Sequence, residues 1–555
     1  MAVHVLPPEL AQEVAAWTTQ DPDPGTREET ARLLRMSQTG DEAAHDELVD
    51  AFSGRLAFGT AGLRGRLGPG PNRMNRVVVG QAAAGLATYL LDTGQAGGPV
   101  LVGYDARHGS AQFARDTAEV LAGAGFAALL TAGPLPTPVV AFGIRHLGCV
   151  AGVVVTASHN PPQDNGYKVY LGDGSQIVPP ADAEIAARIE EVARHDLADV
   201  PRSDAYEVVG PELLAAYRAR VVSLVPDDAP RDLRWVYTPL HGVGGALVGE
   251  VTAAAGFTAP AVVASQAEPD PDFPTVAFPN PEEPGAIDRA LELASRTDAD
   301  LVVANDPDAD RCAVATVVDG SWRMLTGDEL GVLLGEDALR RGVTGAYACS
   351  VVSSSLLGTV ATAYGQPFVS TLTGFKWIGR VPGLAFGYEE AIGYCVDPEA
   401  VRDKDGVSAL VRVLTLVAGL KADGLSVADR LDQIAHTYGV VLTDQLSVRV
   451  DDLSLISHAM ARLRSAPPGG LTGEPVTVSD LAKGSDDLPP TDAVRLSTST
   501  TRVVVRPSGT EPKLKAYLEA RVPLERSAGV EADRLEARAT LASLRTEIAD
   551  ALGLG

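Results

Sequence analysis

One pattern recurs along most of this chain: a short apolar run leads into a loop of glycine, proline and polar residues, and a helical pattern follows. Such runs begin at Pro99, Cys149, Arg234, Ala299 and Tyr347. Strands that alternate with helices in this way indicate α/β units whose sheets are largely parallel. Because such sheets bind ligands at loops beyond the carboxyl ends of the strands, we expect the functional side chains in these loops.

The chain is long enough for several such units. It has 555 residues, and a single hydrophobic core rarely grows past roughly 250–300 residues. Residues 7–52 carry two helical patterns, "PPELAQEVAAW" and "TREETARLLRMS", separated by "DPDPGT". Near the other end, "VLTDQLSVRV" and "TRVVVRPSGTEPKLKAYLEARV" alternate as antiparallel strands do, and "EADRLEARATLASLRTEIADAL" predicts a helix. Residues 464–475 are expected to form a loop or insertion.

Composition excludes several classes of function. The formal net charge is −26, and such a surface repels nucleic acid and anionic membranes. No apolar run of about 18 residues exists, which argues against a membrane span, and the first residues lack the pattern of a signal peptide. The cysteines are far apart and form no CxxC pair, so we expect reduced thiols in a cytoplasmic protein. They are Cys149, Cys312, Cys349 and Cys395.

The loop after the run that begins at Cys149 presents Ser158 and His159, and Lys168 follows shortly after. The intervening "NPPQDNGY" stiffens the backbone, because proline fixes φ. A serine beside a histidine could be a hydrolase nucleophile with its base. However, neighbours in sequence usually point apart, and the GxSxG motif of a nucleophile elbow is absent. The other alternative is an ordinary polar turn after a strand.

The loop "NDPDADR" places Asp306, Asp308 and Asp310 at alternate positions after the apolar run "LVVA". An extended loop can direct alternate side chains at one point, and oxygen ligands at this spacing suit Mg²⁺ or Ca²⁺. An EF-hand is rejected, because Arg311 and Val317 occupy the positions that need glycine and glutamate. Two alternatives stay open: a phosphatase with Asp306 as nucleophile, and a solvated acidic turn.

Four further loops carry weaker signals. "RPSGTEPKLK" (506–515) could wrap a phosphate with backbone N–H groups, hydroxyls and an arginine, or could be an ordinary hairpin loop. "FGYEEAIGY" (386–394) offers two glutamates that could accept from sugar hydroxyls, or could be an acidic turn. "TLTGFKWIG" (371–379) places a lysine beside aromatic residues, or begins a helix with a surface lysine. "FGTAGLRGRLGPGPNRMN" (58–75) could form an anion collar, or a flexible loop.

Together and in this order, these loops resemble those of the α-D-phosphohexomutase superfamily, from about residue 50 to the end. "TASHNP" and "DPDADR" are highly specific signatures. "GTAGLRG", "TPLHGVGG", "FPNPEEPGA" and "TLTGFKWIG" look closer to the phosphoglucomutase-2/phosphopentomutase branch than to the bacterial phosphomannomutase branch. The resemblance implies an α/β protein with three mixed α/β sandwich domains and a C-terminal α+β domain around a central cleft. We expect the domains at 1–208, 209–324, 325–436 and 437–555.

The resemblance also implies roles for individual residues. Ser158 is expected to carry a phosphoryl group and, with Asp306, Asp308 and Asp310, to hold Mg²⁺. His159 is expected to orient the phosphate, Arg64 and Lys168 to surround it, and Lys168 to carry the proton. The substrate-binding set is Arg311, Gly374, Lys376, Glu389 and Glu390. The distal-phosphate set is Arg506, Ser508, Gly509, Thr510 and Lys515.

The implied reaction is a phosphosugar mutase with two phosphoryl transfers through a sugar bisphosphate, activated by a sugar 1,6-bisphosphate. The C-terminal domain is expected to rotate as a lid that keeps water from the phosphoserine. Many hexose enzymes of the family have serine where this chain has Ala391, which removes a hydrogen bond worth roughly 0.5–1.5 kcal/mol. Glucose 1-phosphate/6-phosphate is the first expectation, and ribose or deoxyribose 1-phosphate/5-phosphate is the second.

Three other functions stay open. A sugar bisphosphate synthase belongs to the same branch, whereas a Mg²⁺-dependent aspartyl phosphatase or a non-catalytic sugar-phosphate binding protein would be of another class. The presence of the SHNP and RPSGT loops argues against the phosphatase. We expect a small phosphosugar as the partner of the site, and a monomer or small homo-oligomer.

Overall fold

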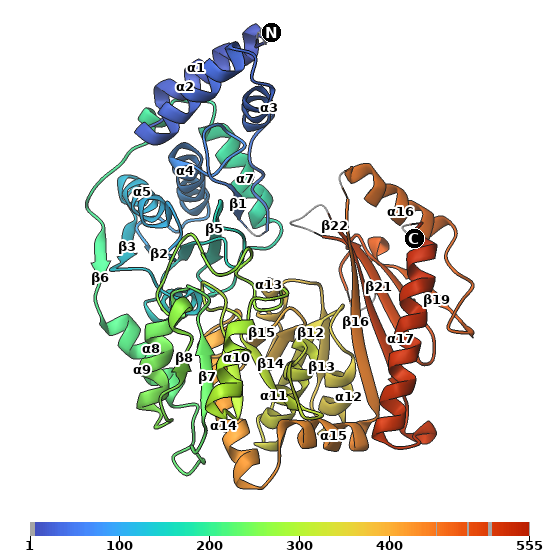
Figure 1. Ribbon diagram of the computed structural model, residues 1–555. Coiled ribbons are helices and arrows are strands. Elements are labelled where there is room, and N and C mark those ends of the chain that lie inside the picture. The colour runs from blue at the N-terminus through green and yellow to red at the C-terminus, as the bar shows by residue number, and fades with distance from the viewer. Residues whose placement is uncertain (1–5, 61, 451, 486–487, 509–512, 554–555) are drawn as a thin grey trace. The chain divides into compact units, whose positions relative to one another are not determined.

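The computed structural model describes residues 6–60, 62–450, 452–485, 488–508 and 513–553 (Figure 1). It divides into two compact units, each described here by itself. The first contains Met1–Ala315 and Glu399–Val411, and the second contains Thr316–Pro398 and Arg412–Gly555. Four sheets of four to six strands, with helices packed against them, confirm the expected α/β class. A further sheet has only two strands.

The first unit begins with a six-stranded sheet in the order β1-β5-β4-β2-β3-β6. Its central strands β4, β2 and β3 are parallel, as the strand–loop–helix pattern predicts, but β5 and β1 run antiparallel to their neighbours. The strands are β1 (Leu63–Arg66), β2 (Pro99–Tyr104), β3 (Ala127–Thr131), β4 (Ala151–Val155), β5 (Asp164–Leu171) and β6 (Glu207–Val209). The helices are α4 (Arg76–Asp92), α5 (Ser110–Gly123), α6 (Thr137–His146), α7 (Ala181–Val192), η1 (Leu197–Asp199) and α8 (Glu212–Val222).

The chain before this sheet forms three helices where the sequence pattern predicts two. They are α1 (Pro8–Gln20), α2 (Pro24–Gln38) and α3 (Glu42–Ala51). Trp17, Leu33, Leu48 and Phe52 are buried in one hydrophobic core with α4 and the sheet. The N-terminal helices are therefore part of the first sheet's core.

The second sheet has the order β11-β10-β9-β7-β8. Strand β7 is parallel to β8 and β9, and β9 is antiparallel to β10. The strands are β7 (Trp235–Thr238), β8 (Ala261–Val262), β9 (Leu301–Ala304), β10 (Ala313–Val318) and β11 (Ser321–Met324). The helices are α9 (Gly244–Ala254), η2 (Ala264–Gln266) and α10 (Asp288–Thr297). All four residues of β9 are buried, so the loop that follows it starts inside the unit.

The second unit contains the third sheet, in the order β13-β12-β14-β15. Strand β12 is parallel to β13 and β14, and β14 turns back into antiparallel β15. The strands are β12 (Ala346–Ser350), β13 (Phe368–Thr371), β14 (Leu384–Glu389) and β15 (Gly393–Cys395). The helices are α11 (Gly327–Arg340), α12 (Leu356–Ala363), α13 (Phe375–Ile378) and α15 (Val427–Tyr438), and α14 (Gly406–Ala422) belongs to this unit from Arg412 on. A capping box between Thr326 and Glu329 starts α11.

The fourth sheet is antiparallel throughout, in the order β16-β22-β21-β20-β19, as the alternating pattern predicts. Its strands are β16 (Val440–Arg449), β19 (Thr477–Asp480), β20 (Val494–Ser497), β21 (Thr501–Pro507) and β22 (Lys513–Val522). The helices are α16 (Leu453–Ser465), η3 (Leu481–Lys483), η4 (Leu524–Arg526) and α17 (Val530–Leu552). Residues 464–475 include the two-stranded sheet β17 (Gly470–Leu471) and β18 (Glu474–Pro475).

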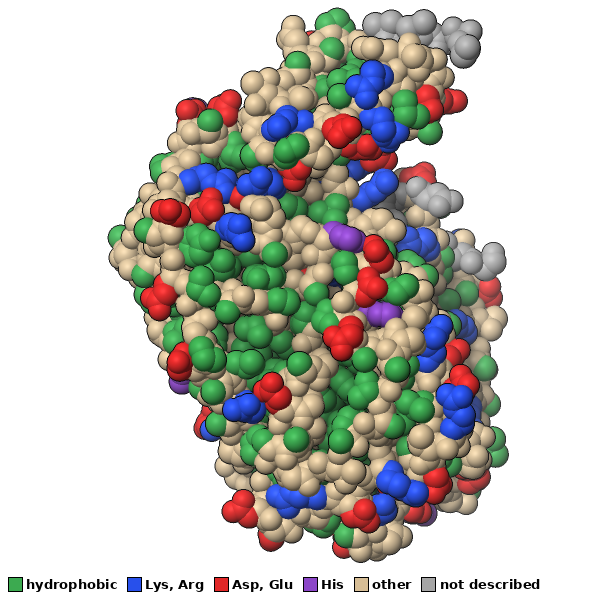
Figure 2. Space-filling view, turned by 60° about the vertical axis from the view of Figure 1, so that its left-hand side comes forward, with side chains coloured by type: hydrophobic (Ala, Val, Ile, Leu, Met, Phe, Trp, Pro, Cys, Tyr) green, Lys and Arg blue, Asp and Glu red, His purple; other side chains and the backbone are tan. Residues whose placement is uncertain are grey.

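The four cysteines are buried, and none of them forms a disulfide. Burial raises the pKa of the Cys149 thiol to about 11, and it also raises the pKa of Cys312 and Cys349. On the face shown in Figure 2, lysine and arginine side chains are scattered among aspartate and glutamate and do not gather into one basic patch. No helix among the described residues has the length and apolar character that crossing a membrane requires.

Candidate active site

Ser158 lies on the turn that follows strand β4 and has a left-handed backbone conformation, with φ +53°. Its side chain is buried. The Ser158 hydroxyl donates to Asp306 Oδ2 at 2.8 Å and lies 3.1 Å from His159 Nδ1. Thr156 Oγ1 accepts from the Ser158 N–H at 2.8 Å. The turn thus holds one hydroxyl against the aspartate loop of the second sheet.

The backbone of this turn is held by a single buried arginine, Arg107, on the loop after β2. Its guanidinium donates to the carbonyls of Ser158 (2.7 Å) and Pro161 (2.8 Å), and also to that of Asn160. The guanidinium carbon lies 4.8 Å from the centre of the Phe273 ring. Several charge-assisted hydrogen bonds from one planar group fix the orientation of the turn.

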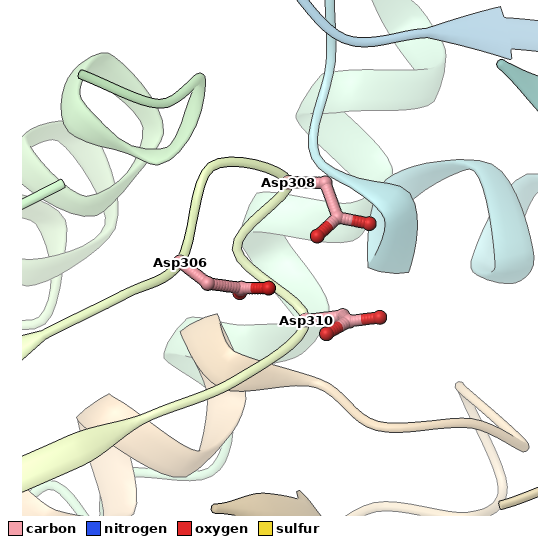
Figure 3. A group of neighbouring side chains, drawn as sticks. All are labelled: Asp306, Asp308 and Asp310. Carbon is pink, nitrogen blue, oxygen red and sulfur yellow. The ribbon is translucent and has the colours of Figure 1, made fainter. Parts of the chain in front are cut away.

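The loop after β9 directs its three carboxylates into one shared space (Figure 3). One ligand oxygen from each of Asp306, Asp308 and Asp310 lies within 4.8 Å of the other two, and all three side chains are buried. Pro307 and Ala309 separate the acids, and Ala309 has φ +52°. The alternate spacing in the sequence therefore brings the side chains together through an irregular loop.

A buried lysine balances part of this negative charge. Lys168 Nζ on strand β5 lies 2.7 Å from Asp308 Oδ2 and 3.0 Å from Asp310 Oδ2. Burial acts to lower the pKa of Lys168, but the two carboxylates outweigh burial and raise it. Burial acts to raise the pKa of Asp310, but Lys168, Lys404 and Arg311 hold it below its ordinary value. Burial and the two neighbouring carboxylates raise the pKa of Asp306.

The cluster fits a hard divalent cation. Asp308 Oδ1 and Asp310 Oδ1 are buried, and within the described residues they accept no hydrogen bond. Buried carboxylate oxygens normally have a partner. Three carboxylates next to a hydroxyl, two of them with an oxygen that accepts no hydrogen bond, match the all-oxygen ligand sets that Mg²⁺ and Ca²⁺ take.

The expected cationic residues gather beside Ser158. Arg64 on β1 donates to Asn160 Oδ1 at 3.3 Å, and the Arg311 guanidinium lies 3.8 Å from Glu282. Burial lowers the pKa of His159, and the positive charges of Arg311 and Arg64 lower it further. His159 therefore favours its neutral form, and the two arginines beside it carry charge suited to a phosphoryl group.

Three residues near the cluster are absent from the sequence-based prediction. Thr137 Oγ1 at the start of α6 donates to Asp308 Oδ2 at 2.6 Å. Lys404 Nζ lies 3.4 Å from Asp310 Oδ2, and Arg107 holds the Ser158 turn as described above. Lysine is scarce in this chain, and Lys404 lies in the polar, glycine-containing segment "RDKDG". These two features together could have indicated Lys404 as a site residue. Thr137 carried no signal.

In the second unit, the predicted sugar-binding residues lie where β14 turns into β15. Glu389 Oε1 accepts from the Gly374 N–H at 2.7 Å, which joins the two loops. Glu390 Oε2 accepts from Ser350 at 3.0 Å and from Ser353 at 2.9 Å. Lys376 follows Gly374 by two residues and lies in α13. Gly374 at the start of α13 thus contacts Glu389 at the end of β14, next to Glu390.

The predicted phosphate loop joins β21 to β22. Arg506 lies opposite Lys515 in the antiparallel register, and the Ser508 N–H donates to the Lys513 carbonyl at 2.8 Å. Gly509 and Thr510 lie outside the described residues. The hairpin therefore places Arg506, Ser508 and Lys515 at one end of the fourth sheet.

Models of known families match nearly the whole chain. Three phosphoglucomutase/phosphomannomutase alpha/beta/alpha domains, I, II and III, match residues 55–196, 215–318 and 326–438. The C-terminal domain of the same family matches residues 447–537. Each matched range contains one of the four larger sheets or most of it. These matches confirm the resemblance and the four-domain architecture.

Individual proteins agree with this assignment. A Haemophilus influenzae protein named "Probable phosphomannomutase" is 48% identical over 455 residues, covering 81% of this chain and 93% of the relative. A Schizosaccharomyces pombe protein named "Probable phosphoribomutase" is 38% identical, covering 93% and 94%. A crystal structure of a phosphoglucomutase/phosphomannomutase family protein from Burkholderia thailandensis shares the fold with a TM-score of 0.68 at 21% identity, covering 90% and 98%. The chain belongs to the phosphoglucomutase/phosphomannomutase family of the α-D-phosphohexomutase superfamily, and it is a phosphomutase, an isomerase-class phosphotransferase.

Proposed function

We propose that this enzyme is a phosphosugar mutase that carries its transferable phosphoryl group on Ser158. One observation carries the proposal. The Ser158 hydroxyl lies 2.8 Å from Asp306 Oδ2, at the edge of a buried cluster of three carboxylates. A serine held on a rigid turn beside a prospective cation site is what a reversible phosphoserine requires.

The residues of the first unit divide the work of the transfer. Asp306, Asp308 and Asp310 would hold Mg²⁺ together with the phosphoserine, and the ion would offset charge that develops on the phosphoryl oxygens. His159 and Arg64 donate hydrogen bonds to those oxygens. Lys168 is protonated in its pairing with the aspartates, so it can deliver a proton to the oxygen that leaves the phosphoryl group. Arg311 contacts the substrate.

The residues of the second unit hold the rest of the substrate. Glu389 and Glu390 accept hydrogen bonds from sugar hydroxyls, with Gly374 and Lys376 in the adjoining loop. The second phosphate of a sugar bisphosphate is held by Arg506, Ser508, Gly509, Thr510 and Lys515. The bisphosphate reverses its orientation between two transfers, and a sugar 1,6-bisphosphate recharges the serine. We keep the domain boundaries 1–208, 209–324, 325–436 and 437–555 as part of this proposal.

Glucose 1-phosphate and glucose 6-phosphate are the first substrate pair that we propose. The motifs that resemble the phosphoglucomutase-2/phosphopentomutase branch support this choice. A second candidate is a pentose 1-phosphate/5-phosphate pair, which is favoured by Ala391 in the sugar loop and by the similarity to a protein named phosphoribomutase. We further propose a cytoplasmic location and a monomer or small homo-oligomer.

The test is conversion of glucose 1-phosphate to glucose 6-phosphate, with Mg²⁺ and a trace of glucose 1,6-bisphosphate. Wild type and Ser158→Ala are compared, and ribose 1-phosphate is assayed in parallel. We expect wild-type isomerisation that requires Mg²⁺, stops on chelation and falls at least about 10³-fold in the variant, because the hydroxyl that would carry the phosphoryl group beside Asp306 is lost. The ratio of the two kcat/KM values identifies the sugar.

A phosphatase with Asp306 as nucleophile gives the opposite result. It releases inorganic phosphate instead of the isomer, and Ser158→Ala stays active while Asp306→Asn is inactive. That outcome would overturn the proposal.

A further inference from the structure

One face of the β21–β22 hairpin carries more than the predicted phosphate loop. Three cross-strand pairs follow one another along this face, because residues two apart on a strand point to the same side. The pairs are Arg506 with Lys515, Val504 with Tyr517, and Arg502 with Glu519. The hairpin that ends in the phosphate loop therefore presents a charged pair two steps further along the same face.

The segment Ser350–Ser355 of the third sheet packs on this face. Val351 and Val352 share an apolar cluster with Val504 and Tyr517. Thus the hairpin and the segment form one packed contact within the second unit.

Arg502 and Glu519 bind the backbone of this segment. The Arg502 guanidinium donates to the Val351 carbonyl at 3.1 Å and also to the Ser353 carbonyl. Glu519 accepts from the Ser355 N–H at 2.7 Å and from the Ser355 hydroxyl at 2.6 Å. Arg502 and Glu519 themselves lie 2.8 Å apart, with side chains 21% and 5% exposed. Both ends of the segment are thereby fixed by charged groups.

The same segment holds Glu390. Ser350 and Ser353 donate their hydroxyls to Glu390 Oε2, and Ser353 Oγ accepts from the Glu390 N–H at 3.1 Å. A continuous path of hydrogen bonds therefore runs from Arg502 and Glu519, through the serine segment, to the carboxylate of Glu390.

We propose that Arg502 and Glu519 are positioning residues for Glu390, which they orient toward the sugar through the Ser350–Ser355 segment. The inference deepens the proposed function and rests on it, because it takes Glu390 as a sugar ligand. Neither Arg502 nor Glu519 contacts the substrate in this assignment. Because the same hairpin carries Arg506, the distal-phosphate seat and the sugar ligand share one rigid support.

The physical reason is the cost of leaving buried polar groups without partners. Without Arg502, two carbonyls lose a charged donor and Glu519 loses its nearest counter-ion. Glu390 then depends on serines whose backbone is no longer fixed. Burial and the nearby Asp328 raise the pKa of Glu390, and the hydrogen bonds from Ser353 and Ser350 oppose this rise, so these donors favour the charged carboxylate.

A double-mutant cycle tests the inference, using whichever of glucose 1-phosphate and ribose 1-phosphate the enzyme converts faster. The variants are Arg502→Met, Glu390→Gln and the combination. Arg502→Met should lower kcat/KM roughly tenfold to a hundredfold, mainly through a higher KM, which is the effect of losing a hydrogen bond to a charged group. In the Glu390→Gln background the same change should lower kcat/KM by less than about threefold, because the residue through which Arg502 acts is already altered.

The matched control is Arg495→Met. Arg495 lies opposite Val504 on β20, so it is on the same face of the sheet, and within the described part of the chain its side chain makes no hydrogen bond or ion pair. Its replacement should leave kcat/KM unchanged. If Arg502→Met fails to fold, as judged by its thermal midpoint, Arg502→Lys is tested in the same cycle. Lysine keeps the positive charge but cannot donate to both carbonyls as the planar guanidinium does.

The outcomes separate this inference from the function on which it rests. Equal losses from Arg502→Met in both backgrounds indicate a purely structural role and overturn the positioning role. A wild-type mutase that tolerates Glu390→Gln also overturns it, yet leaves the phosphoserine mechanism intact. A wild type without mutase activity overturns both proposals.

Discussion

Ser158 illustrates how a single residue in this site is held under strain. Its left-handed backbone costs an L-amino acid roughly 1–2 kcal/mol. The three carbonyls that Arg107 binds, together with the Thr156 cap, offset that cost locally. A strained backbone at one residue is typical of a functional site, because it persists only where the surrounding contacts hold that conformation in place.

His159 gives the site a pH dependence of stability. Burial and two neighbouring arginines keep its folded-state pKa below that of the unfolded chain, about 6.5. As the pH falls below that value, the unfolded state binds a proton that the folded state refuses, so stability is lost. The slope should reach about 1.4 kcal/mol per pH unit, and His159→Asn should remove it.

Urea unfolding of wild type and His159→Asn between pH 5 and pH 8 measures this contribution. The difference in stability between the two proteins should change below about pH 6.5 and stay constant above it. A difference that is independent of pH over the whole range would contradict the assignment.

At this scale the sequence predicts residues whose chemistry is concentrated in a short segment. Ser158 and His159 lie in one loop and the three aspartates lie in another, so the spacing within each loop predicts the site. Arg107 and Arg502 act on backbone carbonyls 51 and 149 positions away or more. Such partners depend on tertiary packing and leave no local pattern. The roles of the predicted residues stay predictions until the variants are assayed.

At the scale of elements, the functional loops follow buried strands. Ser158 comes after β4 and the aspartates after β9, and both strands are fully buried. A third loop, "TPLHGVGG" after β7, packs directly against the aspartate loop. A Cβ on Gly242 would lie 2.4 Å from the Cα of Pro307. The glycine is therefore required for the close approach of these two loops.

Gly242→Ala should displace the aspartate loop. The clash is with backbone, which cannot rotate away, so we expect a loss of roughly 1–3 kcal/mol in stability. We also expect at least about a tenfold drop in Mg²⁺-dependent kcat/KM, because a small misplacement of catalytic groups has a large effect on rate. Thermal denaturation and a Mg²⁺ titration of the activity measure the two effects.

Gly249→Ala is the control for this substitution. Gly249 lies in helix α9, and an added Cβ would meet nothing within 4 Å. Alanine should stabilise the helix by about 1 kcal/mol and leave activity unchanged. If the two variants behaved alike, the clash with Pro307 would not be the cause.

The element pattern was predicted more completely than the pairing of the elements. The parallel strands β2 and β4 follow from the strand–loop–helix pattern, and the antiparallel strands β16, β21 and β22 follow from alternation. The reversed direction of β5 does not, because a strand's partner is chosen by long-range packing. The third N-terminal helix, Glu42–Ala51, is absent from the sequence-based prediction. Its apolar face can be identified only from the core against which it packs.

At the scale of the whole molecule, the excess of acidic residues sets the response to salt. A net charge of −26 places the folded chain under self-repulsion, which the unfolded chain relieves by expanding. Raising NaCl from about 0.02 M to 0.15 M shortens the Debye length to about 8 Å and screens that repulsion. The thermal midpoint, measured with chelator present, should rise by about 1–2 °C for each kcal/mol gained.

Sucrose at the same osmolality is the control for excluded-volume effects. A midpoint that stayed constant or fell with NaCl would indicate that local ion pairs, which salt weakens, outweigh the net repulsion.

The buried cysteines have a practical consequence. A thiol reacts as its thiolate, and in this protein Cys149, Cys312 and Cys349 combine burial with a raised pKa, while Cys395 is buried. We therefore expect the four native cysteines of the folded protein not to react with maleimide dyes. One cysteine introduced at an exposed position of each unit would accept a donor and an acceptor fluorophore without any background deletion. Energy transfer between the dyes would then test, molecule by molecule, whether the two units move during turnover.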